Sequence, residues 1–378
     1  MERRLELDAA RGLMLLWITL THLPTVASIY VNQPFGFFSA AEGFIFLSAL
    51  FTGRIYSRIA AREGFGAMNR KLGMRTLRLY GHHGLLLALT FLIAVPIAEH
   101  GNRPGLHNLL DFYFAAGPIR SVVDGALLVY RPPLLDILPM YIIFLLLTPV
   151  VLMAAARVGW KYVLGGSSVL WLLAQFGLRQ SAYNVVAHFS VTIPLNEMGS
   201  FDLWAWQFLW MLGLWFGVGW AKGNLRIEPW ARKLTVPALV IVSAFLILRY
   251  MVGRGVELGG LAVNFDKWHL GVVRLVDFSA FAVLLVRLQP VMKFLAVRPL
   301  VMLGQASLQV FCAHLFFCFF GLTMMGNASM VSGWRQVLLL ALTFSALLFT
   351  AKIFAKQPKL EPRLTSPALA RRARAAIS

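Results

Sequence analysis

The chain has 378 residues, of which 59% are hydrophobic and only 13% are charged. A soluble domain carries about 25% charged residues, so this composition excludes an ordinary soluble protein and indicates that most of the chain lies in a lipid bilayer. The formal net charge of +19 does not indicate nucleic-acid binding, because the chain shows no soluble basic domain and because membrane proteins concentrate Lys and Arg in their cytoplasmic loops.

The N-terminal segment imitates a secretion signal, with the basic residues of MERR placed before an apolar run. Glu6, Asp8 and Arg11 interrupt that apolar region, and a removable leader has no need for His22, so we expect a retained helix. Arg11 and His22 are eleven positions apart, with ten residues between them, which is about three helical turns. Both side chains therefore lie on one helix face, roughly 16 Å apart along the axis.

Apolar segments of about 20 residues are long enough to cross a bilayer as helices. Pro24 and Pro34 break the chain between the first two such segments. The sequence predicts ten of them, at 9–30, 36–53, 81–98, 137–156, 161–178, 203–221, 234–250, 268–287, 299–321 and 334–353.

If the N-terminus is placed in the cytoplasm and the spans alternate, most of the 35 basic residues fall inside, which supports ten spans with both termini cytoplasmic. We therefore expect an all-α, polytopic helix bundle. It forms one integral membrane domain over residues 1–356, followed by a basic cytoplasmic tail at 357–378. The longest loop, 99–136, faces outside and is placed to cover a site.

Ionisable residues inside a membrane are costly and usually face a cavity or a partner. The topology places His22, Glu42 and His314 at a similar depth in the outer half of the bilayer. A carboxylate that orients an imidazole is a general-base arrangement, and histidine is well suited to accept a hydroxyl proton near neutral pH. We predict catalytic roles for His22 and Glu42. Two alternatives stay open: Glu42 neutralises a neighbouring arginine, and His314 serves helix packing.

Other polar residues receive predictions of their own. Arg274 and Asp277 are three residues apart and are expected to form an intrahelical pair. His82 and His83 are expected to be interfacial. Five polar residues are predicted either to contact substrate or to stabilise the bundle: Asp8, Asp136, Arg274, Asp277 and His314.

Arg75 and Arg78 share a helix face that enters the third span. With Arg11 they are predicted to bind a phosphorylated donor, because arginine suits phosphate well. The sequence has no P-loop, no dinucleotide-binding glycine fingerprint, no zinc spacing and no Gly-x-Ser-x-Gly elbow, which disfavours ATP-driven transport, dehydrogenase chemistry and serine hydrolysis. Cys312 and Cys318, six residues apart on different helix faces, indicate neither a disulfide nor a metal site.

Arg11 and His22 resemble the arginine-ten-histidine signature of the membrane acyltransferase-3 superfamily. The blocks LELDAARGLMLLWITLTHLP and QPFGFFSAAEGFIFLSAL resemble its OpgC branch, which attaches succinyl groups to osmoregulated periplasmic glucans. Further similar blocks are LLDILPMYIIFLLLTPV, WAWQFLWMLGLWFGVG, HLGVVRLVDFSA and LGQASLQVFCAHL. The similarity extends to about residue 355. One departure is Ala49, where the family more often has glycine.

This resemblance implies a multi-pass enzyme of a bacterial inner membrane. It moves an acyl group, with succinyl as one candidate, from a cytoplasmic acyl-CoA to a hydroxyl of a periplasmic glucan or another polysaccharide, without a tightly bound cofactor. By motif match it points to His22 as the catalytic base and to Arg11 as a donor-site or structural residue. The expected partners are membrane lipid and the carbohydrate acceptor. The alternative function is a carrier or flippase for an acylated or anionic solute.

Overall fold

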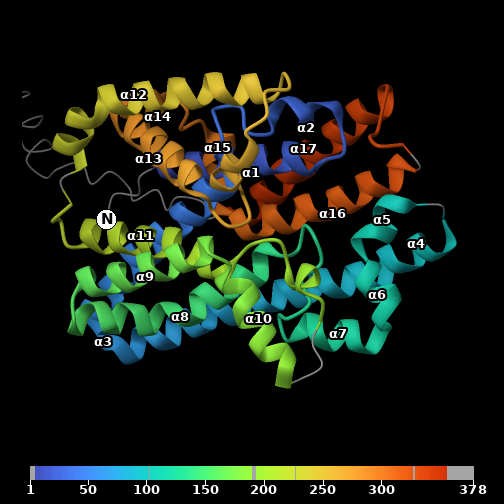
Figure 1. Ribbon diagram of the computed structural model, residues 1–378, viewed down its shortest axis with the longest axis horizontal. Helices are drawn as coiled ribbons and strands as arrows, with labels where there is room; N and C mark the ends of the chain where they lie inside the picture. The colour runs from blue at the N-terminus through green and yellow to red at the C-terminus, as the bar shows by residue number, and fades with distance from the viewer. Residues whose placement is uncertain (1–4, 102, 190–192, 226, 327, 356–378) are drawn as a thin grey trace, which may run out of the picture.

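The computed structural model describes residues 5–101, 103–189, 193–225, 227–326 and 328–355. The predicted basic tail at 357–378 lies outside these residues. Within the described residues the regular structure is helical, and Thr25 and Val331 form an isolated β-bridge. The helices run mostly along one axis, with α12 on the upper edge in Figure 1 and α8 beside α3 on the lower edge.

The first predicted span, 9–30, is divided in the structure. Helix α1 (Leu5–His22) ends at the histidine, and a short helix, α2 (Val26–Val31), follows it. Pro24 explains the break, because its ring disfavours a helical conformation in the residue before it. The prediction of one continuous first span is therefore wrong, and His22 lies at the end of α1 rather than inside a longer helix.

Helix α3 (Ala40–Leu89) contains most of the second predicted span, 36–53, which begins four residues before the helix, and the start of the third. It is a helical hairpin, because Gly64 has a φ of +84° in its middle, a backbone conformation that glycine adopts without strain. Arg75 donates a 3.1 Å hydrogen bond to Thr52, although 23 residues of straight helix would separate them by about 34 Å. The first arm (40–63) and second arm (65–89) thus lie side by side.

The second arm continues through a π-helical turn, η1 (Thr90–Ala94), into α4 (Val95–His100). The segment that we predicted as a long loop, 99–136, then forms short helices at one end of the molecule (Figure 1). These are α5 (Pro104–Leu109), α6 (Asp111–Ala116) and α7 (Pro118–Ala126). Leu106, Leu110 and Phe112 are buried there against Phe91, so an apolar core of its own stabilises this end.

A second group of helices packs on the arms of α3. The group comprises α8 (Ile137–Arg157), α9 (Trp160–Gln175), α10 (Leu178–Phe189), the 3₁₀ turn η2 (Leu195–Met198) and α11 (Leu203–Ala221). Helix α11 contacts both α3 and α9. Trp210 is fully buried at this interface and donates a 3.1 Å hydrogen bond to Thr148 of α8, which satisfies its only polar atom.

The remaining helices form the upper part of Figure 1. They are α12 (Ile227–Val252), η3 (Gly259–Phe265), α13 (Val272–Arg287), α14 (Gln289–Phe294), α15 (Arg298–Gln305), α16 (Ser307–Met325) and α17 (Trp334–Phe354). The predicted span 299–321 is divided at Ala306, where the backbone leaves helical geometry between α15 and α16. This prediction of one continuous span is also wrong.

Five of the described helical segments are long and apolar enough to cross a membrane: 40–100, 137–157, 227–252, 307–325 and 334–354. Only 6% of the apolar window of α12 is buried by the rest of the protein. An apolar helix that is left uncovered in this way fits contact with lipid. The chain is thus an all-helical membrane protein, and ten spans with cytoplasmic termini remain a prediction.

Helix α1 is held against α15 by reciprocal glycines. A Cβ added to Gly304 would lie 1.8 Å from the carbonyl oxygen of Asp8, and one added to Gly12 would lie 2.0 Å from that of Leu300. The obstacles are backbone atoms, which cannot rotate away. Small residues of this kind let helix backbones approach closely in membranes, and here they fix the helix that carries Arg11 and His22.

We predict that Gly304→Ala lowers the free energy of unfolding by about 1–3 kcal/mol, the usual cost of overpacking. The matched control is Gly165→Ala in α9, where an added Cβ meets nothing within 4 Å and where alanine favours the helix. Thermal unfolding of the two variants in detergent measures the difference. Equal stability of the two variants would contradict the close approach of α1 and α15.

Candidate functional site

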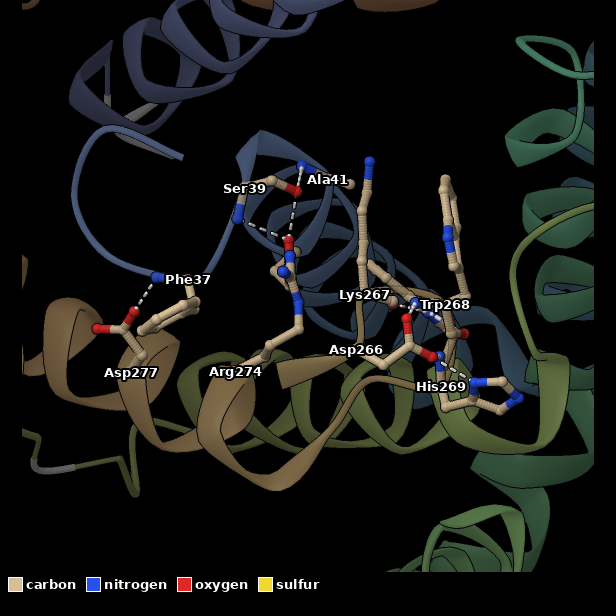
Figure 2. Close-up of polar contacts among 11 residues, drawn as sticks. Phe37, Ser39, Ala41, Asp266, Lys267, Trp268, His269, Arg274 and Asp277 are labelled. Atoms are coloured by element: carbon tan, nitrogen blue, oxygen red, sulfur yellow. Dashed lines mark hydrogen bonds and ion pairs between the residues drawn. The ribbon is translucent and has the colours of Figure 1, made fainter. Parts of the chain in front are cut away.

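Glu42 lies at the start of α3, where it closes a capping box. Its carboxylate accepts hydrogen bonds from the Ser39 backbone N–H at 3.0 Å and from the Ser39 hydroxyl at 2.7 Å. It also forms an ion pair with Arg274 of α13, whose Nε donates at 2.8 Å and whose Nη2 donates as well. Both side chains are fully buried. Figure 2 shows Arg274 extending from α13 toward Ser39.

Asp277 takes a different partner from the one we predicted. Its carboxylate accepts a 2.6 Å hydrogen bond from the backbone N–H of Phe37, toward which it points in Figure 2. The expected intrahelical pair with Arg274 is therefore wrong. The first turn of α3 offers the carboxylate of Glu42 to Arg274, and the segment before α3 offers the backbone N–H of Phe37 to Asp277.

His22 faces His314 of α16, not Glu42. The two rings are stacked at 25° with centroids 5.6 Å apart, and Nδ1 of His22 lies 3.3 Å from Nε2 of His314. Nδ1 of His314 lies 2.6 Å from the carbonyl oxygen of Phe311. His314 is buried, whereas His22 remains partly exposed.

This chain of contacts fixes the tautomer of both rings. A carbonyl oxygen only accepts hydrogen bonds, so Nδ1 of His314 carries the proton and donates to Phe311. Nε2 of a neutral His314 is then an acceptor, and Nδ1 of His22 must donate to it. Nε2 of His22 is left without a proton, as a general base requires. We expected Glu42 to orient His22, but the contacts give this position to His314.

A cavity of about 80 Å³ lies on the other part of α1. Arg11 lines it and donates a 2.5 Å hydrogen bond to the hydroxyl of Ser307. Arg75 lines it from the second arm of α3, with hydrogen bonds to Thr52 and, at 2.5 Å, to the hydroxyl of Tyr141. The hydroxyl groups of Thr52 and Tyr141 accept these N–H groups of Arg75 without neutralising its positive charge, so the cavity suits an anion.

Phe311 connects this cavity with the histidine pair. It lines the cavity, its ring centroid lies 4.6 Å from that of His314, and its carbonyl oxygen accepts the hydrogen bond that Nδ1 of His314 donates. The volume is enough for two or three waters at about 30 Å³ each. It is below the roughly 300–1,000 Å³ of a typical small-molecule site, so a larger ligand would have to widen it.

Three residues that we predicted to bind the donor, to contact substrate or to stabilise the bundle do not line this cavity: Arg78, Asp8 and Asp136. Arg78 is exposed on the second arm and does not line it. Asp8 is buried in α1. Asp136 precedes α8 and accepts a 3.1 Å hydrogen bond from the backbone N–H of Ser200, while burial raises the pKa of its carboxyl group.

Sequence reasoning assigned no role to the histidine in the loop before α13. His269 hydrogen bonds through Nδ1 to Asp266, with Lys267 and Trp268 between them (Figure 2). The hydrogen bond to Asp266 raises the pKa of His269. Burial raises the pKa of Asp266, but the hydrogen bonds from His269 and Trp268 outweigh it and the net shift is downward. The i, i+3 spacing of aspartate and histidine in a polar loop was the available signal.

Comparison with known proteins places the chain in a family. A family model described as OpgC protein matches residues 3–358. The chain therefore belongs to the OpgC protein family, which implies a membrane enzyme of the transferase type. No curated protein and no solved structure matches the chain.

We predict that Arg274→Met lowers the free energy of unfolding by about 3–5 kcal/mol, because it leaves the carboxylate of Glu42 buried without a counter-charge. Adding Glu42→Gln to this variant removes the uncompensated charge, so the double variant should lose much less than the sum of the single losses. Chemical unfolding of the three variants in detergent measures this coupling. Additive losses would show that the two side chains act independently.

Proposed function

We propose that this protein is a transmembrane O-acyltransferase that moves an acyl group from a cytoplasmic acyl-CoA to a hydroxyl of a periplasmic glucan or another polysaccharide. The proposal includes a place in a bacterial inner membrane, with both termini in the cytoplasm. Membership of the OpgC family supports this class of reaction. The observation that carries it is the chain from Phe311 through His314 to His22, which leaves Nε2 of His22 as a base.

The two arginines of the cavity supply the donor site. The phosphates of the donor bind near Arg11 and Arg75, and its pantetheine arm runs beside α1 toward His22. The helix rise gives about 16 Å between Arg11 and His22, which is comparable to the reach of that arm. Phe311, which lines the cavity and contacts His314, lies on this path. A succinyl group is one candidate for the acyl group.

The transfer follows from the tautomer of His22. Nε2 of His22 takes the proton of the sugar hydroxyl while that oxygen forms a bond to the thioester carbonyl carbon. The carbon–sulfur bond then breaks, and the proton passes from His22 to the leaving thiolate. His314 accepts a hydrogen bond from Nδ1 throughout, so it holds the ring in its orientation and tautomer, as the triad aspartate does in serine proteases, but without that aspartate's negative charge. Transfer through an acyl-histidine intermediate is an alternative route through the same residue.

We predict that His22→Gln lowers kcat by about 100- to 10,000-fold, the usual contribution of a general base, while donor affinity is retained. Acyl transfer to polysaccharide, followed by mass spectrometry, measures the loss. His82→Ala is the matched control, because that histidine is bonded to the backbone carbonyl of Arg78 on the second arm of α3. Normal acylation by His22→Gln with loss of solute uptake would favour a carrier or flippase over the enzyme.

His314 is a positioning residue, and two variants of it distinguish positioning from packing in the same acyl-transfer assay. In His314→Gln the side-chain carbonyl still accepts from Nδ1 of His22, whereas in His314→Leu nothing does. The glutamine variant should therefore retain more activity than the leucine variant, with a smaller change in the pH profile of kcat. Equal losses in both variants would mean that His314 serves packing alone.

We predict that Arg75→Gln raises the KM for acyl-CoA by about 10- to 100-fold, as expected for the loss of a hydrogen bond to a charged group. Arg78→Gln, three residues along the same arm but exposed and outside the cavity, is the control and should leave this KM unchanged. Steady-state kinetics at varied donor concentration give both values. A raised KM in the Arg78 variant alone would move the donor site out of the cavity.

A further inference from the structure

A third side chain of chemical interest lies at the histidine pair. Cys318 follows His314 by four residues on α16, which places both on the same face of that helix. One ring nitrogen of each of His22 and His314 and the sulfur of Cys318 all lie within 4.8 Å of one another. Cys318 is fully buried and His314 is 1% exposed, whereas His22 keeps part of its surface open.

We propose that His22, His314 and Cys318 form a binding site for Zn²⁺ or a similar thiophilic divalent cation. Two imidazoles and a thiolate are ligands that zinc prefers, whereas Mg²⁺ and Ca²⁺ prefer oxygen. The site does not depend on the proposed function, but its effect on catalysis does.

The geometry of the two rings supports a metal ion between them. In a tetrahedral site with Zn–N bonds of about 2.0–2.1 Å, two nitrogens lie about 3.3 Å apart. Nδ1 of His22 and Nε2 of His314 are separated by 3.3 Å. Nδ1 of His314 remains bonded to the carbonyl oxygen of Phe311, which is the outer hydrogen bond that orients a histidine ligand in metal sites. Three protein ligands leave a fourth position for water.

Metal binding at this place would switch off the base. When Nδ1 of His22 binds the ion, the proton of the neutral ring moves from Nδ1 to Nε2. Nε2 then carries a proton and cannot accept one from a hydroxyl. Cys318 loses its thiol proton to solvent as the sulfur–metal bond forms. The bound ion therefore inhibits acyl transfer, in contrast to the activating zinc of hydrolases.

The test uses the full-length protein in detergent, stripped of metal with a chelator and titrated with Co²⁺ as a spectroscopic substitute for zinc. We expect saturation at one ion per chain, with the visible bands of tetrahedral cobalt and a thiolate-to-cobalt charge-transfer band. Zn²⁺ should displace the cobalt, and Mg²⁺ should not. Cys318→Ala should abolish the charge-transfer band. Because this variant removes a metal ligand, it should weaken zinc affinity by more than the roughly 10- to 100-fold that follows from the loss of an outer hydrogen bond to a ligand.

Cys312→Ala is the matched control, since this cysteine lies on the same helix six residues earlier and outside the cluster. It should keep the spectrum and the affinity of the unmodified protein. A charge-transfer band that survives Cys318→Ala, or cobalt binding that never saturates, would overturn the proposal. Circular dichroism and thermal unfolding show that each variant is folded before its spectrum is compared.

The same preparation separates this proposal from the proposed function. A protein that binds cobalt with these bands but transfers no acyl group supports the metal site and contradicts the acyltransferase. A protein that transfers acyl groups but binds no cobalt supports the acyltransferase and overturns the metal site. In the active protein, zinc should lower the transfer rate of the unmodified chain and of Cys312→Ala more than that of Cys318→Ala.

Discussion

The ion pair between Glu42 and Arg274 ties together parts of the chain that are 232 residues apart. Each charge is costly inside an apolar bundle, and each is tolerated because the other compensates it. The carboxylate also closes the capping box with Ser39, so one side chain sets where α3 begins and where α13 lies against it. Asp277 reinforces this junction through Phe37. The placement of the first arm of α3, and of the helices packed on it, depends on this junction.

A different principle positions the histidines. Their hydrogen bonds form a directed chain that ends at a backbone carbonyl, and such a carbonyl can only accept. The direction of every proton in the chain follows from that one group. The chain of hydrogen bonds itself contains no ionised carboxylate, which avoids the cost of burying a charge beside the base. Phe311 supplies both this carbonyl and part of the cavity wall, so the backbone of α16 links the proposed base to the proposed donor site.

Much of the membrane character was predictable, but the boundaries of individual helices were not. The predicted spans 137–156, 203–221 and 334–353 match α8, α11 and α17 closely, because a long apolar run has few alternatives to a helix in lipid, and α8 continues even through Pro149. The spans around Pro24 and Ala306 were divided by local backbone geometry. The reversal between the predicted spans 36–53 and 81–98 is present, but hydropathy does not show that helix continues from both spans to a turn at Gly64.

The sequence by itself determined that the chain is an all-helical membrane protein. It singled out His22, Glu42 and His314 as costly groups inside the membrane, and Arg11 and Arg75 as candidates for donor binding. It did so because composition and spacing along one helix are local properties. Only the tertiary structure decided the partners: His314 for His22, Arg274 for Glu42, and Cys318 beside the two histidines. Depth in a bilayer can be read from position along a helix, but the direction that a side chain faces depends on how each helix is rotated and packed, and that is set by contacts distant in sequence.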